Sequence, residues 1–308
     1  MTNFRDALSN YLTMRRGLGF KLASDERGLI SFVSFVELNG PPEYITVQIA
    51  ADWCLRGSSQ QITKVTRLRY VRGFTQYLKL IDSRTEIPSQ DLIKCKAKRA
   101  RPYLYTDREI ERLMKAASGL DTVDGLRHLT YHYLLGLLSV TGMRISEAIS
   151  LNVGDVDFKA SILTVRGTKF GKSRLIPLHD TTCEALRKYK VSRDQIGNDD
   201  SESAAFFISS RRTRLNYRVV LKTFDMLCQQ IGIRGRGKVH VPRIHDLRHR
   251  MAVNTLLRWY RNGDDPERRL PALATYLGHV HVADTYWYLT ACPELMQEAV
   301  KRLEQRGR

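Results

Sequence analysis

Residues 141–147 read Thr-Gly-Met-Arg-Ile-Ser-Glu and follow a strongly apolar segment, residues 131–140, that predicts a buried helix. Gly142 is a turn residue and would close that helix. Arg144 and Glu147 stand three positions apart on one predicted helical turn, so the carboxylate can brace the guanidinium. Because surface ion pairs have the same spacing, the meaning of this pair depends on the rest of the chain.

A second arginine further along the chain has an acid–base group beside it. Residues 245–249 read His-Asp-Leu-Arg-His, which places His245 three positions before Arg248. Two guanidinium forks can grip the non-bridging oxygens of one phosphate, a geometry that the ammonium of lysine reproduces poorly. A basic helix also produces this pattern by chance, so the two arginines carry weight only together.

A hairpin is predicted between the two arginines. Residues 162–165 and 173–177 have the apolar pattern of two short strands, and Lys169 lies in the loop that joins them. Gly171 allows the backbone of this loop to approach a ligand closely, and a lysine there can protonate a leaving oxygen. Lys172 and Arg174 are nearby rivals for that role, and a merely solvated turn is the alternative.

A tyrosine completes the set. Leu277-Gly278-His279 ends a predicted helix at a glycine, and Tyr288 follows nine residues later. Its hydroxyl can attack phosphorus, although a single tyrosine is more typical of core packing, and Tyr286 lies close by. Taken together, the arginines, the lysine, the histidines and this tyrosine indicate a phosphate-handling site with a tyrosine nucleophile.

The overall charge agrees with a polyanionic partner. The chain has 308 residues, with 50 Lys and Arg against 32 Asp and Glu, which gives a formal charge of +18. A generically basic surface is the alternative. With 43% apolar residues, the chain is long enough for two domains with cores of their own. No signal peptide or transmembrane stretch stands out, so we expect a cytoplasmic protein.

The histidines and cysteines do not favour a metal site. The five cysteines, at positions 54, 95, 183, 228 and 292, form no CxxC pair and predict reduced core thiols. His279 with His281, and His245 with His249, have spacings that zinc ligands can have. No cluster of thiolates or carboxylates accompanies them, so the sequence predicts no metal.

Two domains and a basic linker are expected. Residues 1–83 predict a helical bundle, with Ser24 capping one helix and the apolar positions from Ile62 to Ile81 of the longest helix facing inward. Residues 84–105 predict the linker, and residues 106–308 the second domain, which opens with a capping box from Thr106 to Glu109. The residues expected to contact DNA are Lys64, Arg67 and Arg72 on the bundle, Lys98 and Arg101 in the linker, and Lys172 and Arg174 at the hairpin.

The end of the chain predicts one more helix. From about Pro293, apolar residues recur at helical spacing and form a stripe that must be buried. Packing on its own domain and docking on a neighbouring copy both satisfy this requirement.

In their order, the motifs at 141–147, 169–174, 245–249 and 277–279, followed by Tyr288, resemble those of the tyrosine recombinase (phage integrase) family. The resemblance is specific over residues 103–308 and loose over the first hundred. It implies an α-helical N-terminal bundle and a mixed α/β catalytic domain that is mainly helical with a small antiparallel sheet. It also implies a site-specific recombinase that cuts and rejoins DNA through a 3′-phosphotyrosyl intermediate, without a cofactor, in the integration, excision or transposition of a mobile element. Residues 286–291 look most like transposon-associated branches.

The resemblance assigns a role to each motif residue. Arg144 and Arg248 would bind the scissile phosphate, with Glu147 in support. His245 and His279 would assist proton transfer, Lys169 would be the general acid, and Tyr288 would be the nucleophile because it keeps the family's spacing from Leu-Gly-His. The implied partners are double-stranded DNA with paired recombination sites and further copies of the chain, a tetramer in synapsis.

Two other functions remain open at this point. A non-catalytic DNA-binding protein of the same fold would explain the charge, but it should have lost at least one of these residues. A type IB topoisomerase would share the tyrosine chemistry and would relax supercoils as a monomer.

Overall fold

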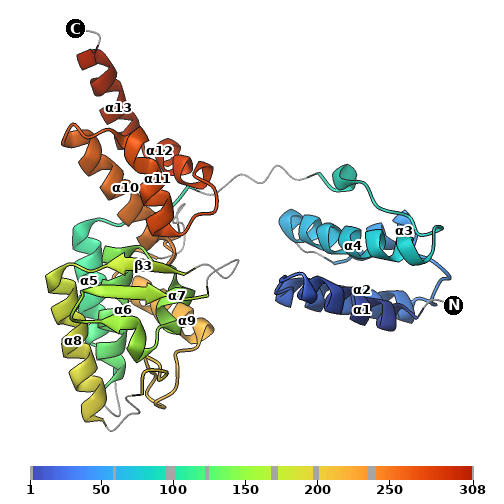
Figure 1. Cartoon of the computed structure of the whole chain (residues 1–308), viewed down its shortest axis with the longest axis horizontal. Helices are drawn as coiled ribbons and strands as arrows, with labels where there is room; N and C mark the ends of the chain where they lie inside the picture. Colours follow the sequence, from blue (N-terminus) through green and yellow to red (C-terminus); the bar gives the residue numbers. More distant parts are fainter. Residues whose placement is uncertain are drawn as a thin grey trace. The chain divides into compact units, whose positions relative to one another are not determined.

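The computed structural model describes residues 3–57, 60–94, 101–121, 125–167, 173–196, 201–234 and 241–306. The chain divides into two compact units, residues 1–99 and 100–308, each with its own core (Figure 1). The architecture is mainly helical with one small antiparallel sheet, which confirms the predicted fold class.

The first unit is a helical bundle. Its helices are α1 (Phe4–Gly17), α2 (Ala23–Leu38), α3 (Val47–Leu55), α4 (Gln61–Ile81) and the short 3₁₀ helix η1 (Gln90–Leu92). Asn3 caps α1 and Thr46 caps α3, because their side-chain oxygens accept hydrogen bonds from free backbone N–H groups of the first turn. The core includes an edge-to-face contact between Phe32 and Trp53, whose ring centroids are 5.3 Å apart.

Three sequence predictions for this unit need correction. Ser24 does not cap α2, which begins one residue earlier at Ala23 after Leu22 in a left-handed conformation. Ile62 and Ile81 are exposed, because they lie in the first and last turns of α4, beyond the core that the middle of the helix covers. The linker predicted at 84–105 is partly packed, since Ile93 is buried in this core and Tyr105 in the core of the second unit.

The second unit begins with three α-helices, a 3₁₀ helix and a small sheet. These are α5 (Asp107–Ser118), α6 (Arg127–Thr141), α7 (Ile145–Ser150) and the 3₁₀ helix η2 (Val153–Asp155), followed by β1 (Val156–Asp157), β2 (Ile162–Val165) and β3 (Arg174–Pro177). The predicted capping box of Thr106 and Glu109 starts α5. The sheet has the order β1-β2-β3 with antiparallel pairing, and Leu163 and Val165 face Ile176 and Arg174 across it.

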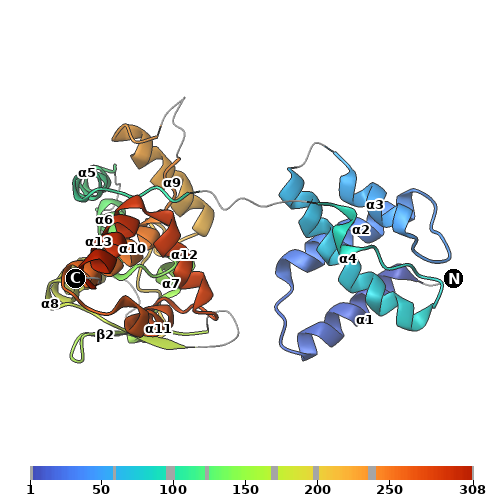
Figure 2. The same ribbon diagram turned by 90° about the horizontal axis from the view of Figure 1, so that it is seen from above.

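Helices α8 (Asp180–Gln195) and α9 (Tyr217–Gln230) complete this core. The last four helices are α10 (Asp246–Arg261), α11 (Pro266–Leu277), α12 (Ala283–Ala291) and α13 (Pro293–Arg306). They lie together as one group (Figures 1 and 2) and share a second apolar core with members from each of them.

The C-terminal helix packs on its own unit. Leu295 is buried in the core shared by the last four helices, and α13 lies against α10. Met296 and Val300 are exposed, so α13 buries only part of the apolar stripe. One part of the stripe therefore packs locally in the single chain, and docking of the other part on a neighbouring copy stays a prediction.

Cys54, Cys183, Cys228 and Cys292 are buried, as predicted for core thiols, and Cys95 lies outside the described residues. Among the described residues, every helix is too short or too polar to cross a membrane.

Candidate active site

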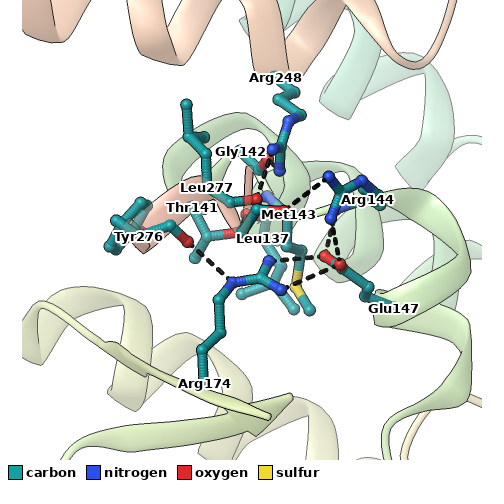
Figure 3. Close-up of polar contacts among 11 residues, drawn as sticks. Leu137, Thr141, Gly142, Met143, Arg144, Glu147, Arg174, Arg248, Tyr276 and Leu277 are labelled. Carbon is teal, nitrogen blue, oxygen red and sulfur yellow. Dashed lines mark hydrogen bonds and ion pairs between the residues drawn. The ribbon is translucent and has the colours of Figure 1, made fainter. Parts of the chain in front are cut away.

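The C-terminal end of α11 collects three arginines from distant parts of the chain. A helix leaves its last carbonyl groups without partners inside the helix, and they carry the negative end of the helix dipole. Arg174 Nε donates to the carbonyl oxygen of Tyr276 at 2.8 Å, Arg248 Nη2 to that of Leu277 at 2.5 Å, and Arg144 Nη2 to that of Gly278 at 3.1 Å. Figure 3 shows Arg174 and Arg248 meeting this helix end. Three successive carbonyl groups therefore gather three cations at one point.

Glycine is required at the position that ends this helix. Gly278 has a φ of +67°, in the left-handed region, and it caps α11. A Cβ atom built on it would lie 2.9 Å from Arg174 Nη1. In the Leu-Gly-His motif, the glycine therefore serves two purposes. It adopts a left-handed backbone conformation that is unfavourable for residues with a side chain, and its lack of a Cβ atom leaves space for Arg174.

Glu147 binds two of these arginines at once. Its carboxylate accepts hydrogen bonds from the Arg144 backbone N–H and Nη1, both at 2.8 Å, and from Arg174 Nη1 at 3.0 Å and Nη2 at 2.7 Å (Figure 3). Burial opposes the ionisation of Glu147, but the hydrogen bonds from Arg174 and Arg144 lower its pKa to about 2. The carboxylate is therefore ionised at neutral pH and braces Arg144, as its spacing in the sequence indicated.

Arg248 is the most deeply placed of the three arginines. Arg248 belongs to the first turn of α10, and its side chain is buried. Its Nη1 donates to the carbonyl oxygen of Gly142 at 3.0 Å. Gly142 ends α6 in the left-handed region, with a φ of +60°, and this turn presents its carbonyl group to Arg248. Burial lowers the pKa of Arg248 to about 10, so the guanidinium is still charged at neutral pH.

Tyr288 is only 2% exposed and lies close enough to Arg248 for the guanidinium charge to act on its hydroxyl. Burial raises the pKa of Tyr288, and the charge of Arg248 opposes this shift. Tyr286 is 46% exposed, because two positions along α12 correspond to a rotation of about 200° around the helix. Of the two candidate nucleophiles in the sequence, only Tyr288 is at the site.

The two predicted histidines lie beside these groups. The ring of His279 stacks on that of Tyr288, with centroids 6.0 Å apart and planes 20° apart, and its Nδ1 is 2.8 Å from Thr285 Oγ1. Burial, with the charges of Arg248 and Arg144, lowers the pKa of His279 to about 4. His245 has an exposed side chain, yet desolvation of its ring and the charge of Arg248 lower its pKa as well. Both rings are neutral at neutral pH.

A third histidine, which the sequence analysis left without a role, packs into this group. The ring of His249 lies 5.3 Å from that of Tyr288, 5.0 Å from that of Trp287 and 5.0 Å from that of His245, between centroids. Burial lowers the pKa of His249 to about 3. Trp287, for which no role follows from the sequence, packs edge-on to both His249 and Tyr288.

A model of the phage integrase family matches residues 104–294 of this chain. The chain belongs to this family. The integrase/recombinase y4rB of Sinorhizobium fredii is 51% identical over 99% of this chain and 98% of its own length, and the tyrosine recombinase XerD of Caulobacter vibrioides is 32% identical over 80% and 76%. A structure of the Tn1549 transposon integrase in complex with transposon right end DNA matches 98% of this chain and 99% of its own, with a TM-score of 0.69 at 17% identity.

As a tyrosine recombinase, the protein cleaves and rejoins DNA at specific sites. Five of the six predicted catalytic positions, Arg144, His245, Arg248, His279 and Tyr288, lie in the described part of this family's characteristic domain, together with Glu147. Lys169, the predicted general acid, and Lys172 lie outside the described residues.

The residues predicted to contact DNA differ in their exposure and in the contacts that they make within the protein. Lys98 lies outside the described residues, and Arg101 is exposed. Arg67 Nη1 donates to the carbonyl oxygen of Arg56 at 2.9 Å and its guanidinium lies over the ring of Trp53, while Arg72 donates to the carbonyl oxygen of Pro88. Part of each of these two guanidinium groups therefore holds the bundle together. Lys64, on the same helix, is half-buried.

Arg174 differs most from its prediction as a DNA contact. Its side chain is only 10% exposed, and all three of its nitrogens donate to Glu147 or to the carbonyl oxygen of Tyr276. The correction follows from its position as the first residue of β3, where pairing with Val165 directs the strand against the end of α11. The sequence pattern shows a basic residue beside a hairpin but contains no sign of what the guanidinium contacts.

Proposed function

We propose that Tyr288 is the nucleophile of the recombinase and that Arg144 and Arg248 bind the scissile phosphate. The observation that supports this assignment is the placement of the buried Tyr288 ring, which stacks on His279 directly after the end of α11 where both arginines meet, with the charge of Arg248 acting on its hydroxyl. A phenol beside the phosphate-binding groups is placed to attack the phosphorus atom.

Arg144 keeps capacity for a phosphate. A guanidinium has five N–H groups, and the described side-chain contacts of Arg144 use two of them, to Glu147 and to Gly278. About a third of its side chain is exposed, whereas Arg248 is enclosed. We infer that Arg144 meets the phosphate from the open side and Arg248 from the side of the nucleophile. Donors fixed in advance in this way stabilise charge on the non-bridging oxygens as it develops.

The proposed step balances as a transesterification. The bond from the Tyr288 oxygen to phosphorus forms, and the bond from phosphorus to the 5′-oxygen breaks. The phenolic proton passes to a neutral histidine of the site, His245 or His279, and Lys169 supplies a proton to the departing oxygen. A 5′-hydroxyl of the partner duplex then attacks the phosphorus atom and loses its proton, the bond from phosphorus to the Tyr288 oxygen breaks, and the phenol regains a proton. One phosphodiester bond is thus exchanged for another, so no external energy source is needed.

We infer that the DNA partner carries paired recombination sites and that several copies of the chain, a tetramer in synapsis, act on it. The charge of +18 supports a DNA partner. So does the Tn1549 integrase structure, in which a protein of this fold is in complex with transposon DNA.

The assignment of the nucleophile is tested by trapping the covalent intermediate. The recombination site is first sought as paired inverted repeats in the DNA that flanks the gene, and the substrate is a duplex of that site with a nick next to the cleavage position so that the released strand is lost. We expect Tyr288→Phe to bind this duplex like the wild type and to form no covalent adduct, and Tyr286→Phe, the matched control, to form it. An adduct with Tyr288→Phe, or its loss with Tyr286→Phe, would refute the assignment.

A further inference from the structure

Arg174 is the one arginine at the end of α11 that the proposed reaction does not use. We propose that Arg174 is a positioning residue, which fixes Glu147, and through it Arg144, against the C-terminal end of α11. This inference rests on the proposed function of Arg144 as a phosphate-binding group.

The first support is the geometry of the contact with Glu147. The two terminal nitrogens of Arg174 donate to the two carboxylate oxygens of Glu147 at 3.0 and 2.7 Å, a fork-to-fork arrangement that fixes the angle of the carboxylate as well as its distance. The remaining nitrogen, Nε, donates to the carbonyl oxygen of Tyr276 at 2.8 Å (Figure 3). The guanidinium therefore joins α7 to the last turn of α11.

The second support is that Glu147 divides its oxygens between two arginines. Oε1 accepts from Arg144 Nη1 and Arg174 Nη1, and Oε2 accepts from the Arg144 backbone N–H and Arg174 Nη2. Two cations against one anion leave a net positive charge, so Arg144 is oriented by Glu147 without being neutralised by it. Removing Arg174 would leave the carboxylate with Arg144 as its one cationic partner among the described residues, and free to turn further towards it.

The third support is that the surroundings allow Arg174 little movement. It begins β3, it is 10% exposed, and Gly278 leaves only the space that its guanidinium occupies. Displacement of Arg174 would therefore move the helix end that also receives Arg144 and Arg248.

Lysine can test this role because it keeps the charge but loses the fork. A single ammonium cannot meet both oxygens of Glu147 in one plane and also reach the carbonyl oxygen of Tyr276. We expect Arg174→Lys to lower the rate of adduct formation at saturating nicked duplex by about 10-fold to 100-fold, because an active-site misplacement of about 1 Å has effects of this size. The affinity for a single site should change by less than about threefold, because Arg174 does not touch the phosphate.

Two further variants separate positioning from stability. Arg193 is a fully buried arginine of α8, bonded to Asp194 and to the carbonyl oxygen of Ala205 in another part of the same unit. We expect Arg193→Lys to lower thermal stability while adduct formation below the unfolding transition keeps its rate. Glu147→Gln should slow the reaction, and adding Arg174→Lys to it should slow the reaction little further, because both changes break the same link.

The outcomes distinguish this inference from the proposed function. If the wild type forms no adduct, the proposed function fails and this inference fails with it. If the wild type reacts and Arg174→Lys reacts at the same rate, or loses only affinity, Arg174 is not a positioning residue. Rate losses that multiply in the variant carrying both Glu147→Gln and Arg174→Lys would also overturn the inference.

Discussion

The side chains around Tyr288 show how burial shifts the pKa values of single residues. Tyr288, His249 and His279 pack ring against ring, and burial raises the pKa of the phenol while it lowers those of the two imidazoles. The arginines close by add to the shift of the histidines, since a cation disfavours a second cation. The site in the free protein therefore holds a neutral tyrosine next to neutral histidines, which can accept its proton.

These shifts predict how stability depends on pH. An unfolded histidine has a pKa of about 6.5, whereas the folded values are about 3 for His249 and about 4 for His279. Between about pH 6.5 and 4 the unfolded chain binds protons that the folded chain does not. The free energy of unfolding should therefore fall as the pH drops through this window. The contribution of Glu147, whose folded pKa is about 2, should be lost only below about pH 4.5, the ordinary value for this group.

Urea unfolding at a series of pH values measures this dependence, with His249→Phe as the test variant. The phenyl ring keeps the packing against Tyr288 and Trp287 but cannot bind a proton. We expect a shallower loss of stability between about pH 6.5 and 4 in His249→Phe than in the wild type. Equal slopes in the two proteins would show that His249 titrates normally in the folded state.

The motif residues were predictable from the sequence because their order and spacing are unusual in combination. Arg144, Arg248, His279 and Tyr288 all reach one place in the structure. The contacts of Arg174 and His249 were not predictable, because a basic residue beside a hairpin and a histidine on a helix have many common uses. What decides them is packing between elements far apart in the chain, and local patterns do not encode it.

At the scale of elements, the end of α11 organises the site. Its last three carbonyl groups take one arginine each, from β3, α10 and the start of α7. The sequence shows where this helix ends, through Gly278, but not what gathers there. The boundaries of α6, β2 and β3 were predicted within a few residues, whereas β1 was missed because two residues leave no periodicity to detect.

Comparing alanine variants of two glycines should separate two effects of a Cβ atom at Gly278: backbone strain in the left-handed turn, and a clash with Arg174. In Gly278→Ala the methyl group would both strain a left-handed backbone and press on Arg174. Gly263→Ala is the matched control, because Gly263 has a φ of +75° but its added Cβ would meet no atom within 4 Å. Both variants should lose about 1–2 kcal/mol of stability.

Only Gly278→Ala should slow adduct formation, by up to about 100-fold, because only it displaces an arginine of the site. Single-turnover rates on the nicked duplex, measured below both unfolding transitions, decide the matter. If the two variants react equally fast, the space at Gly278 does not matter for catalysis.

At the scale of the whole molecule, the chain consists of two units with separate cores and a large positive charge. We expect both units to bind the DNA backbone. Neutralising about 6–10 phosphates would weaken binding by about 10³–10⁵ between about 50 and 200 mM salt. A gel-shift or anisotropy titration across this range measures the effect, and a flat salt response would contradict a backbone-dominated interface.

The linker should make the second contact with DNA intramolecular. Residues 1–95 and 103–308, made as separate pieces, should each bind a single site more weakly than the whole chain. An equimolar mixture of the two pieces is the control, and it should not recover the affinity of the whole chain. If either piece alone binds as tightly as the whole chain, the two units do not act together on the site.

The most direct measurement is the identity of the residue that carries the DNA after cleavage. Trypsin would release residues 270–301 as one peptide, which contains Tyr276, Tyr286 and Tyr288. After nuclease digestion of the trapped adduct, fragmentation of this peptide by mass spectrometry locates the attached nucleotide. The proposed function predicts a nucleotide joined through its 3′-phosphate to Tyr288. A nucleotide on Tyr276, on Tyr286 or on any residue outside this peptide would contradict the proposed site.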